Sequence, residues 1–200
     1  MENKITISKG NKKMGEIKSV SLPPIVSCAK NCTCAKKCYA AKLCRIYKNV
    51  KKSYEKNFEI LNNNPADYWE QVEKVLRTSR FFRFHVSGDI PNAEYLENMV
   101  EVVRNNPHCD VLAFTKQYDF INRMIDEGTE IPSNLHIIFS EWEGMKMDNP
   151  HNMPVAHVIF KGKTANDNWK ICTGNCLECA MNGENCWALN HGEHVAFHEH

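Results

Sequence analysis

The cysteines of this chain fall into two groups, and their placement limits what the chain can fold into. Segment 27–44 (SCAKNCTCAKKCYAAKLC) holds five cysteines, segment 172–187 (CTGNCLECAMNGENCW) holds four, and Cys109 lies between them. The first residues (MENKITISKGNKK) contain no apolar run typical of a signal peptide, and no run reaches membrane-spanning length. We therefore expect a cytoplasmic protein without a membrane partner. Thiols stay reduced in the cytoplasm, where clustered cysteines usually bind metal.

The first group has the spacing C-x3-C-x-C-x3-C-x5-C. Thiolates this close together on one loop can converge on one metal centre without long-range folding. Structural zinc sites commonly contain a C-x2-C or C-x4-C pair, and no such pair occurs before Cys38. Wider gaps suit an iron–sulfur cluster, because its irons are spread over a larger volume than a single ion. We expect a [4Fe–4S] cluster here, with zinc as the alternative, and the predicted ligands are Cys28, Cys32, Cys34 and Cys38.

The second group reads C-x3-C-x2-C-x6-C. Four thiolates saturate a metal centre, which is typical of a structural zinc or an electron-transfer cluster. The predicted ligands are Cys172, Cys176, Cys179 and Cys186. The chain would thus carry one or two [4Fe–4S] clusters. Trp187 is expected to shield the second group, and Cys109, which precedes an apolar strand, is expected to be a small buried side chain.

Predicted strands and helices alternate from residue 50 to residue 160. The strands are expected at 81–86, 110–114, 135–139 and 155–160, and the helices at 46–61, 65–78, 91–106 and 118–128. Nearly continuous apolar strands in such alternation indicate parallel strands covered by helices. With 16–20 as a possible first strand, we expect an α/β fold in the form of a partial, open, parallel β/α barrel, since the chain is short for eight strands and eight helices.

Two regions are expected in this fold. Residues 1–165 would form the α/β core and carry the first cysteine group on a loop near the N-terminus. Residues 166–200 would form the second cysteine group and a closing edge strand, HVAFH at 194–198.

Polar residues follow each predicted strand, and in a parallel sheet these strand ends lie on one edge, where α/β proteins place their sites. Every strand must leave the core through polar residues, so each residue alone carries little weight. The combination of HVSGD after one strand and TK after the next favours a shared pocket. Its predicted residues are His85, Ser87, Asp89, Thr115, Lys116, Ser140, Glu141 and Lys161.

The formal net charge of +1 is unevenly distributed. Residues 1–60 contain fourteen Lys or Arg and four acidic residues, a net charge of +10, which leaves −9 for the remaining 140 residues. A basic third suggests an anionic small molecule or nucleic acid as partner, although a solvated lysine-rich surface gives the same composition. A zinc-stabilised nucleic-acid-binding protein, with Tyr39, Tyr47 and Tyr54 stacking on bases, is therefore the alternative function.

Four motifs together resemble the phage gene product eighty-eight family over nearly the whole chain. They are Cys28-x5-Cys34-x3-Cys38-Tyr-Ala-x-Lys42, FHVSGD at 84–89, FTK at 114–116 and the terminal C-x2-C…C-W at 176–187. The resemblance implies Cys28, Cys34 and Cys38 as ligands, with Cys32 close enough to be a fourth. It implies a phage or mobile-element protein and names no reaction.

At a more distant level, the layout resembles a shortened radical S-adenosylmethionine (SAM) core. In those enzymes a cysteine loop and helices precede a strand that ends in a GGEP turn, whose acid binds the amino group of SAM. SGDIP would place Asp89 in that role, with Ser87, Gly88 and Thr115 also binding the cofactor and Lys116 and His85 joining Asp89 in catalysis. Three thiolates would leave one iron open to SAM or a small substrate, whereas four would permit electron transfer only. Whether the protein is an enzyme thus depends on Cys32.

Overall fold

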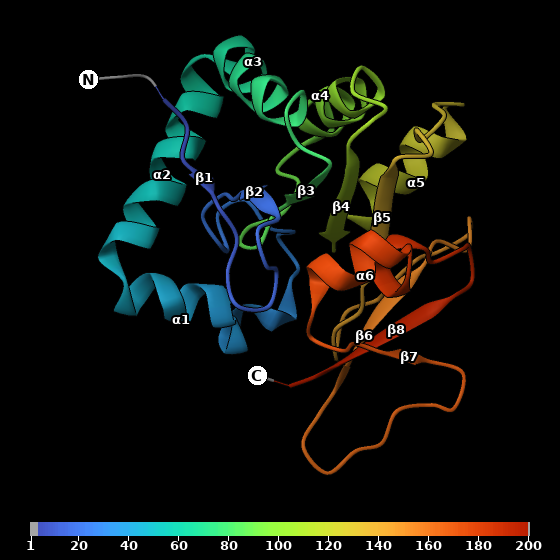
Figure 1. The fold of residues 1–200 in the computed structure, drawn as a ribbon. Helices are drawn as coiled ribbons and strands as arrows, with labels where there is room; N and C mark the ends of the chain where they lie inside the picture. Colours follow the sequence, from blue (N-terminus) through green and yellow to red (C-terminus); the bar gives the residue numbers. More distant parts are fainter. Residues whose placement is uncertain (1–3, 200) are drawn as a thin grey trace.

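The computed structural model describes residues 4–199 and contains one eight-stranded sheet (Figure 1). The strands are β1 (Ile7–Ser8), β2 (Lys18–Val20), β3 (Phe81–Phe84), β4 (Asp110–Thr115), β5 (Leu135–Ser140), β6 (Val155–Ile159), β7 (Lys170–Ile171) and β8 (His194–His198). The helices are α1 (Tyr39–Ile46), α2 (Lys48–Asn63), α3 (Pro65–Leu76), α4 (Ala93–Arg104), α5 (Tyr118–Asp126) and α6 (Cys176–Asn182), with 3₁₀ turns η1 (Thr33–Lys37) and η2 (Asn185–Trp187).

The sheet confirms the α/β class and the parallel core. Its strand order is β1-β2-β3-β4-β5-β6-β8-β7, and every pair except β1–β2 is parallel. The sheet is open, with β1 and β7 at its edges, so the barrel part of the prediction is not confirmed. The expectation that residues 194–198 form an edge strand is wrong, because the unpredicted β7 pairs with the outer side of β8. The predicted boundary at residue 165 falls between β6 and β7, which belong to the same sheet.

Two helix boundaries differ from the sequence prediction. The helix expected at 46–61 is divided, because Tyr47 has an extended backbone (φ −107°, ψ 93°) between α1 and α2. Pro91 lies outside α4, because the side chain of Asn92 caps that helix by accepting the N–H of Tyr95 at 2.8 Å. Asn64 caps α3, its side chain accepting the N–H of Asp67 at 3.3 Å. No helix in residues 4–199 is long and apolar enough to cross a membrane.

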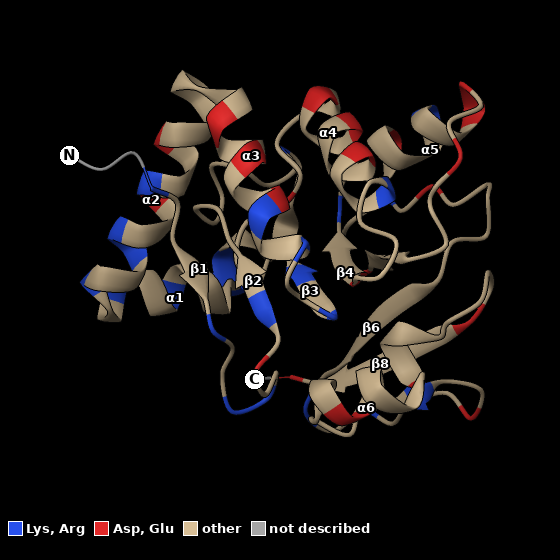
Figure 2. Cartoon of the chain, turned by 45° about the horizontal axis from the view of Figure 1, so that its top comes forward, with Lys and Arg blue, Asp and Glu red and all other residues tan. Residues whose placement is uncertain are grey.

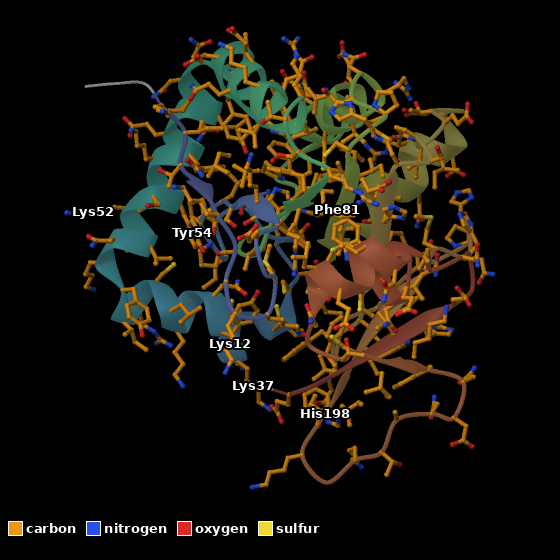
Figure 3. The ribbon with its side chains drawn as sticks, viewed as in Figure 1. Lys12, Lys37, Lys52, Tyr54, Phe81 and His198 are labelled. Atoms are coloured by element: carbon orange, nitrogen blue, oxygen red, sulfur yellow. The ribbon has the colours of Figure 1, made fainter. Side chains whose placement is uncertain are left out.

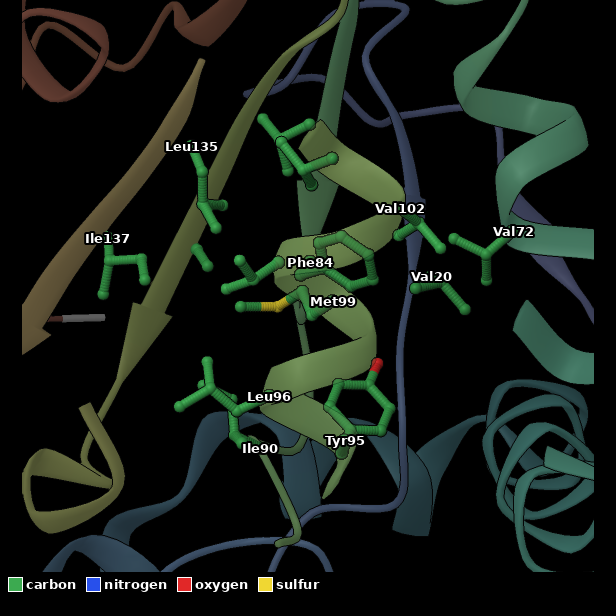
Figure 4. Packing of buried hydrophobic residues seen from close by; sticks show 14 of the residues in the cluster. Val20, Val72, Phe84, Ile90, Tyr95, Leu96, Met99, Val102, Leu135 and Ile137 are labelled. Atoms are coloured by element: carbon green, nitrogen blue, oxygen red, sulfur yellow. The ribbon is translucent and has the colours of Figure 1, made fainter. Parts of the chain in front are cut away.

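The sheet is covered on both faces, and alternate strand residues contribute to two separate cores. Phe82 and Phe84 of β3 belong to the larger core, which the apolar faces of α2 to α5 complete; Figure 4 shows Phe84 with Leu96 and Met99 of α4. Phe81 belongs to the smaller core and lies beside α6 (Figure 3). The C-terminal cysteine segment therefore covers the second face of the sheet.

His85 ends β3 inside a group of aromatic side chains. The residue is 4% exposed and has φ +60°, a left-handed conformation uncommon outside glycine. Its Nε2 lies 3.0 Å from the hydroxyl of Tyr95, which lies 3.1 Å from the hydroxyl of Tyr68. Burial, with a smaller effect from the charge of Arg83, lowers the pKa of His85 to about 3. The imidazole is therefore neutral in the folded protein.

We predict that His85 makes the protein less stable in acid. In the unfolded chain the imidazole takes up a proton below its ordinary pKa of about 6.5, whereas in the folded chain it stays neutral until about 3. Acidification from pH 6.5 to pH 5 should thus cost about 2 kcal/mol through this residue alone. Urea unfolding at pH 7.5 and pH 5.0 measures the loss. His85→Asn, which tolerates the left-handed backbone, should lose correspondingly less. Equal losses in parent and variant would contradict the buried neutral imidazole.

Candidate functional site

The turn after β3 places a buried carboxylate at the C-terminal edge of the sheet. Asp89 is 5% exposed, and its Oδ1 accepts the hydroxyl of Thr115 at 2.7 Å and the N–H of Ile90 at 2.8 Å. Its Oδ2 accepts the N–H of Lys116 at 2.8 Å. Burial raises the pKa of the Asp89 carboxyl, and these hydrogen bonds oppose the rise. The ends of β3 and β4 are thus joined through one side chain.

Lys116 extends this connection to the next strand. Its ammonium donates to Ser140 Oγ at 2.7 Å, at the end of β5, and lies 5.9 Å from the ring centroid of Trp142. The hydroxyl of Tyr118 donates to the Ser140 carbonyl at 2.6 Å. Three consecutive strand ends therefore meet in one polar site. We call it the strand-end site, and its residues are Asp89, Thr115, Lys116 and Ser140.

The cysteine loop is fastened to the same turn. The N–H of Leu22 donates to the Ser87 carbonyl at 3.0 Å, and the N–H of Asp89 donates to Ser27 Oγ at 3.2 Å. Tyr39, at the start of α1, donates its hydroxyl to the Val86 carbonyl. These contacts bring the loop that carries the first cysteines next to the strand-end site.

Four thiols of this loop, the first thiol group, lie within the electrostatic reach of one another and of the strand-end site. They are Cys28, Cys32, Cys34 and Cys38. Burial and then the charge of Asp89 raise the pKa of Cys28 to about 12. A hydrogen bond between the thiols of Cys32 and Cys34 lowers the pKa of Cys32 and raises that of Cys34. The charge of Lys116 adds to the lowering at Cys32 and opposes the rise at Cys34. Cys38 caps α1, its sulfur accepting the N–H of Ala41 at 3.4 Å. The fifth cysteine of the segment, Cys44, is buried on α1.

Four of the remaining five thiols form the second thiol group, in the smaller core on one face of the sheet. They are Cys172, Cys176, Cys179 and Cys186. Burial raises the pKa of Cys186 to about 12, and the three other thiols contribute in the same direction. The charge of Arg83 opposes this rise at Cys186 and also at Cys176. The Cys179 sulfur accepts from Asn185 Nδ2 at 3.3 Å and lies 3.5 Å from Thr173 Oγ1.

All ten cysteines are free thiols. Among residues 4–199, no three side chains of His, Cys, Asp or Glu stand in an arrangement that could hold one metal ion. Each thiol group is gathered in space without forming a finished single-ion site. Cys109 is fully buried in the larger core, as predicted.

Several residues of the predicted pocket lie elsewhere. The ring of His85 faces the aromatic side chains of the larger core. Glu141 hydrogen-bonds His157 of β6, whose ring stacks on Trp169 at 3.8 Å and whose Nε2 lies 2.9 Å from His194 Nδ1. The N–H of Lys161 is directed at Glu199, 3.5 Å away.

Ser87 and Ser27 complete the description of the turn. Ser87 is 4% exposed, and its hydroxyl has no hydrogen-bond partner within the part of the chain that is described. Ser27, which the sequence analysis did not select, holds the backbone of Asp89. No motif marks Ser27, because its role depends on a contact with a residue 62 positions away.

Gly88 is required where the loop and the turn meet, which gives a testable prediction. It has φ +79°, and a Cβ there would lie 2.5 Å from Ser27 Oγ and 2.8 Å from the Leu22 carbonyl oxygen. Gly88→Ala should therefore cost about 3 kcal/mol or more, combining left-handed strain with overpacking. Gly128→Ala is the matched control, because Gly128 has φ +82° and open space around its Cβ position; it should cost about 1–2 kcal/mol. Urea unfolding of both variants checks this, and equal losses would show that the loop does not press on the turn.

Comparison with known proteins gives one match. A family model described as Gene product 88 matches residues 2–195, which is nearly the whole 200-residue chain. Neither the search of curated proteins nor the search of solved structures found a match. The cysteine loop, the strand-end site and the second thiol group all lie inside the matched range. The chain therefore belongs to the phage gene product 88 family.

Proposed function

We propose that this protein transfers electrons through a [4Fe–4S] cluster held by the first thiol group. The observation that carries the proposal is the placement of the four-cysteine loop against the strand-end site, through Ser27, which accepts the N–H of Asp89, and Tyr39, which donates to the Val86 carbonyl. A chance collection of surface cysteines has no reason to converge on the strand ends of a parallel sheet, where α/β proteins bind their ligands.

The chemistry of the donors fits this group. Residues 21–38 contain four cysteines and no histidine, aspartate or glutamate. Iron–sulfur clusters are held by such thiolate sets. The thiols are close together, yet no three in the described chain surround a single-ion position. The cysteine spacing, C-x3-C-x-C-x3-C without a C-x2-C or C-x4-C pair, favours a cube over one zinc ion. Zinc remains the alternative that metal analysis distinguishes.

The position of Cys32 supports electron transfer rather than an enzyme with an open iron. Cys32 is hydrogen-bonded to Cys34, and the charge of Lys116 acts on its thiol, so it shares the surroundings of the other proposed ligands. With Cys32 as the fourth ligand, the bound cluster supplies one-electron transfer. The comparisons give no support to a radical-SAM-like core. Both carboxylate oxygens of Asp89 already accept hydrogen bonds from Thr115 or from the N–H of Lys116, so Asp89 serves to position the strand ends.

Lys116 would have the main electrostatic role. Its ammonium is fixed by Ser140, contributes to the lowered pKa of Cys32 and opposes the raised pKa of Cys34. A fixed positive charge stabilises thiolate over thiol, so it favours the ligand form of these cysteines. The same charge favours the addition of an electron to the site.

The second thiol group is proposed to be a structural metal centre. It lies in a short segment whose helix α6 has seven residues and whose buried side chains include Cys179 and Cys186. So short a segment has few apolar side chains to hold it on the sheet. Metal–thiolate bonds supply folding free energy in segments of this kind.

The proposed cluster predicts the metal content of anaerobically purified protein. We expect about four iron and four sulfide per chain if only the first group holds a cube, and about eight of each if both do. Cys34→Ser should lose the iron and sulfide of the first centre, whereas Cys109→Ser, which removes a buried thiol outside both groups, should keep them. One or two zinc ions without sulfide would contradict the proposal. A change in the electron paramagnetic resonance spectrum on adding SAM would show an open iron and disprove pure electron transfer.

The proposed structural metal centre predicts how much stability the second thiol group contributes. Cys179→Ser should lower the melting temperature of the metal-loaded protein clearly more than Cys109→Ser does, because it removes a ligand as well as a buried side chain. After treatment with a chelator the two variants should differ much less. Thermal unfolding of loaded and chelator-treated samples measures both differences. A Cys179→Ser variant that melts like Cys109→Ser when loaded would show that Cys179 is not a ligand.

A further inference from the structure

Helix α1 presents apolar side chains to solvent beside the first thiol group. Tyr39 (45% exposed), Leu43 (39%) and Ile46 (58%) follow the spacing i, i+4, i+7, which places them on one side of the helix, and Tyr47 (56% exposed) follows at its C-cap. Ala40 and Cys44 form its buried side. Six of the eight large hydrophobic residues that are exposed in the described chain lie between residues 25 and 47. The exposed apolar residues are thus concentrated in the segment that carries the first thiol group, and such a concentration marks a candidate interaction site.

The other two of these six residues lie on a strained turn. Ile25 has φ +72° and is 53% exposed, and Val26 is 69% exposed. A β-branched residue is a true outlier in the left-handed region, and such strain is concentrated at functional sites. The N–H of Ile25 donates to the Cys28 sulfur at 3.3 Å, so the turn is tied to the first thiol group. We call the six residues the α1 surface.

The segment that carries the α1 surface is basic. From residue 17 to residue 54 the chain contains nine Lys or Arg and no Asp or Glu. Figure 2 shows basic residues along α2 and the β1–β2 connection, and acidic residues mainly on α3, α4 and α5. Lys37 pairs with Glu199, near the C-terminal end of the chain, and Lys51 pairs with Glu55. Within residues 4–199 no salt bridge is formed by Lys30, Lys36, Lys42, Arg45, Lys48 or Lys52.

We propose that the α1 surface docks an acidic one-electron carrier protein. An apolar centre with a charged rim is the usual composition of a protein interface, and the rim of this one requires carboxylates on the partner. Four of the six apolar residues are aliphatic and cannot stack on bases, which favours a protein over a single-stranded nucleic acid. An electron carrier is the proposed class of partner because the α1 surface adjoins the first thiol group. Cys38 caps α1, and the Cys28 sulfur accepts the N–H of Ile25 in the turn.

The size of the surface indicates a transient complex. An eight-residue helix is about 12 Å long. Such a small contact belongs with the weak encounters typical of electron-transfer pairs, whose interfaces bury less than about 1,200 Å². The thiols of the first thiol group would hold the cluster, which would accept one electron from the reduced carrier, with no bond formed or broken. This partner assignment rests on the proposed electron-transfer function, whereas the α1 surface itself does not.

The test is calorimetric titration of the anaerobically purified protein with two acidic carriers, a flavodoxin and a plant-type [2Fe–2S] ferredoxin. We expect at least one to bind at 25 mM NaCl with a Kd in the micromolar range, and to bind at least about tenfold more weakly at 300 mM NaCl. The double variant Leu43→Ser/Ile46→Ser should weaken binding at least about tenfold, because it removes the apolar centre. Met181→Ser, which alters an exposed apolar residue on α6, is the matched control and should bind like the parent.

Three results would overturn the docking proposal. They are no binding of either carrier, binding that Leu43→Ser/Ile46→Ser leaves unchanged, and tighter binding of a 20-nucleotide single strand that the same variant abolishes. Self-association of the chain that this variant abolishes, measured by sedimentation, would assign the surface to a second copy instead. Iron and sulfide are measured on the same sample, so a failure of the proposed function is recognised separately from a failure to bind.

Discussion

The buried carboxylate of Asp89 is the contact on which the arrangement of the site depends. Its oxygens hold Thr115 and the backbone of Lys116, and its own N–H is held by Ser27. Burying a carboxylate is costly unless hydrogen bonds replace its water, and here the ends of two strands provide them. Burial nonetheless leaves the pKa of this carboxyl raised, so the compensation is partial. The turn, the strand ends and the cysteine loop therefore form one unit around this side chain.

Much of this arrangement could be predicted from the sequence because it follows from short-range patterns. Apolar runs predict the strands, and the rule that parallel strands end on one edge predicts that Asp89, Thr115, Lys116 and Ser140 lie together. Features that depend on distant contacts could not be predicted. Ser27 carries no signal, and His85 turns into the larger core only because its backbone is left-handed. The place of β8 in the sheet depends on β7, a two-residue strand too short for periodicity to detect.

The two thiol groups lie in different physical settings, and this supports different roles for them. The first group adjoins polar strand ends and Lys116, whose charge helps to lower the pKa of Cys32, while burial raises the pKa of Cys28. The second group takes part in the smaller core, with Cys186 and Trp187 buried against the sheet. Arg83 of β3 faces that side, and its charge opposes the rise that burial causes in the pKa of Cys186 and of the Tyr39 hydroxyl next to the first group. One cation thus acts on the surroundings of both groups.

Two roles could explain the basic first third of the chain: compensation of the negative charge of the thiolates, and recognition of an acidic partner. Thiolate centres are negative, and nearby cations such as Lys116 offset that charge where it is buried. Compensation alone would require basic side chains turned toward the thiols. Lys42, Arg45 and Lys48 are exposed instead, on and beside a helix whose solvent side is apolar. Exposed charges interact weakly with a centre inside the protein and strongly with an approaching charged surface. The lysines around α1 are therefore better explained by recognition of an acidic partner than by charge compensation of the metal site.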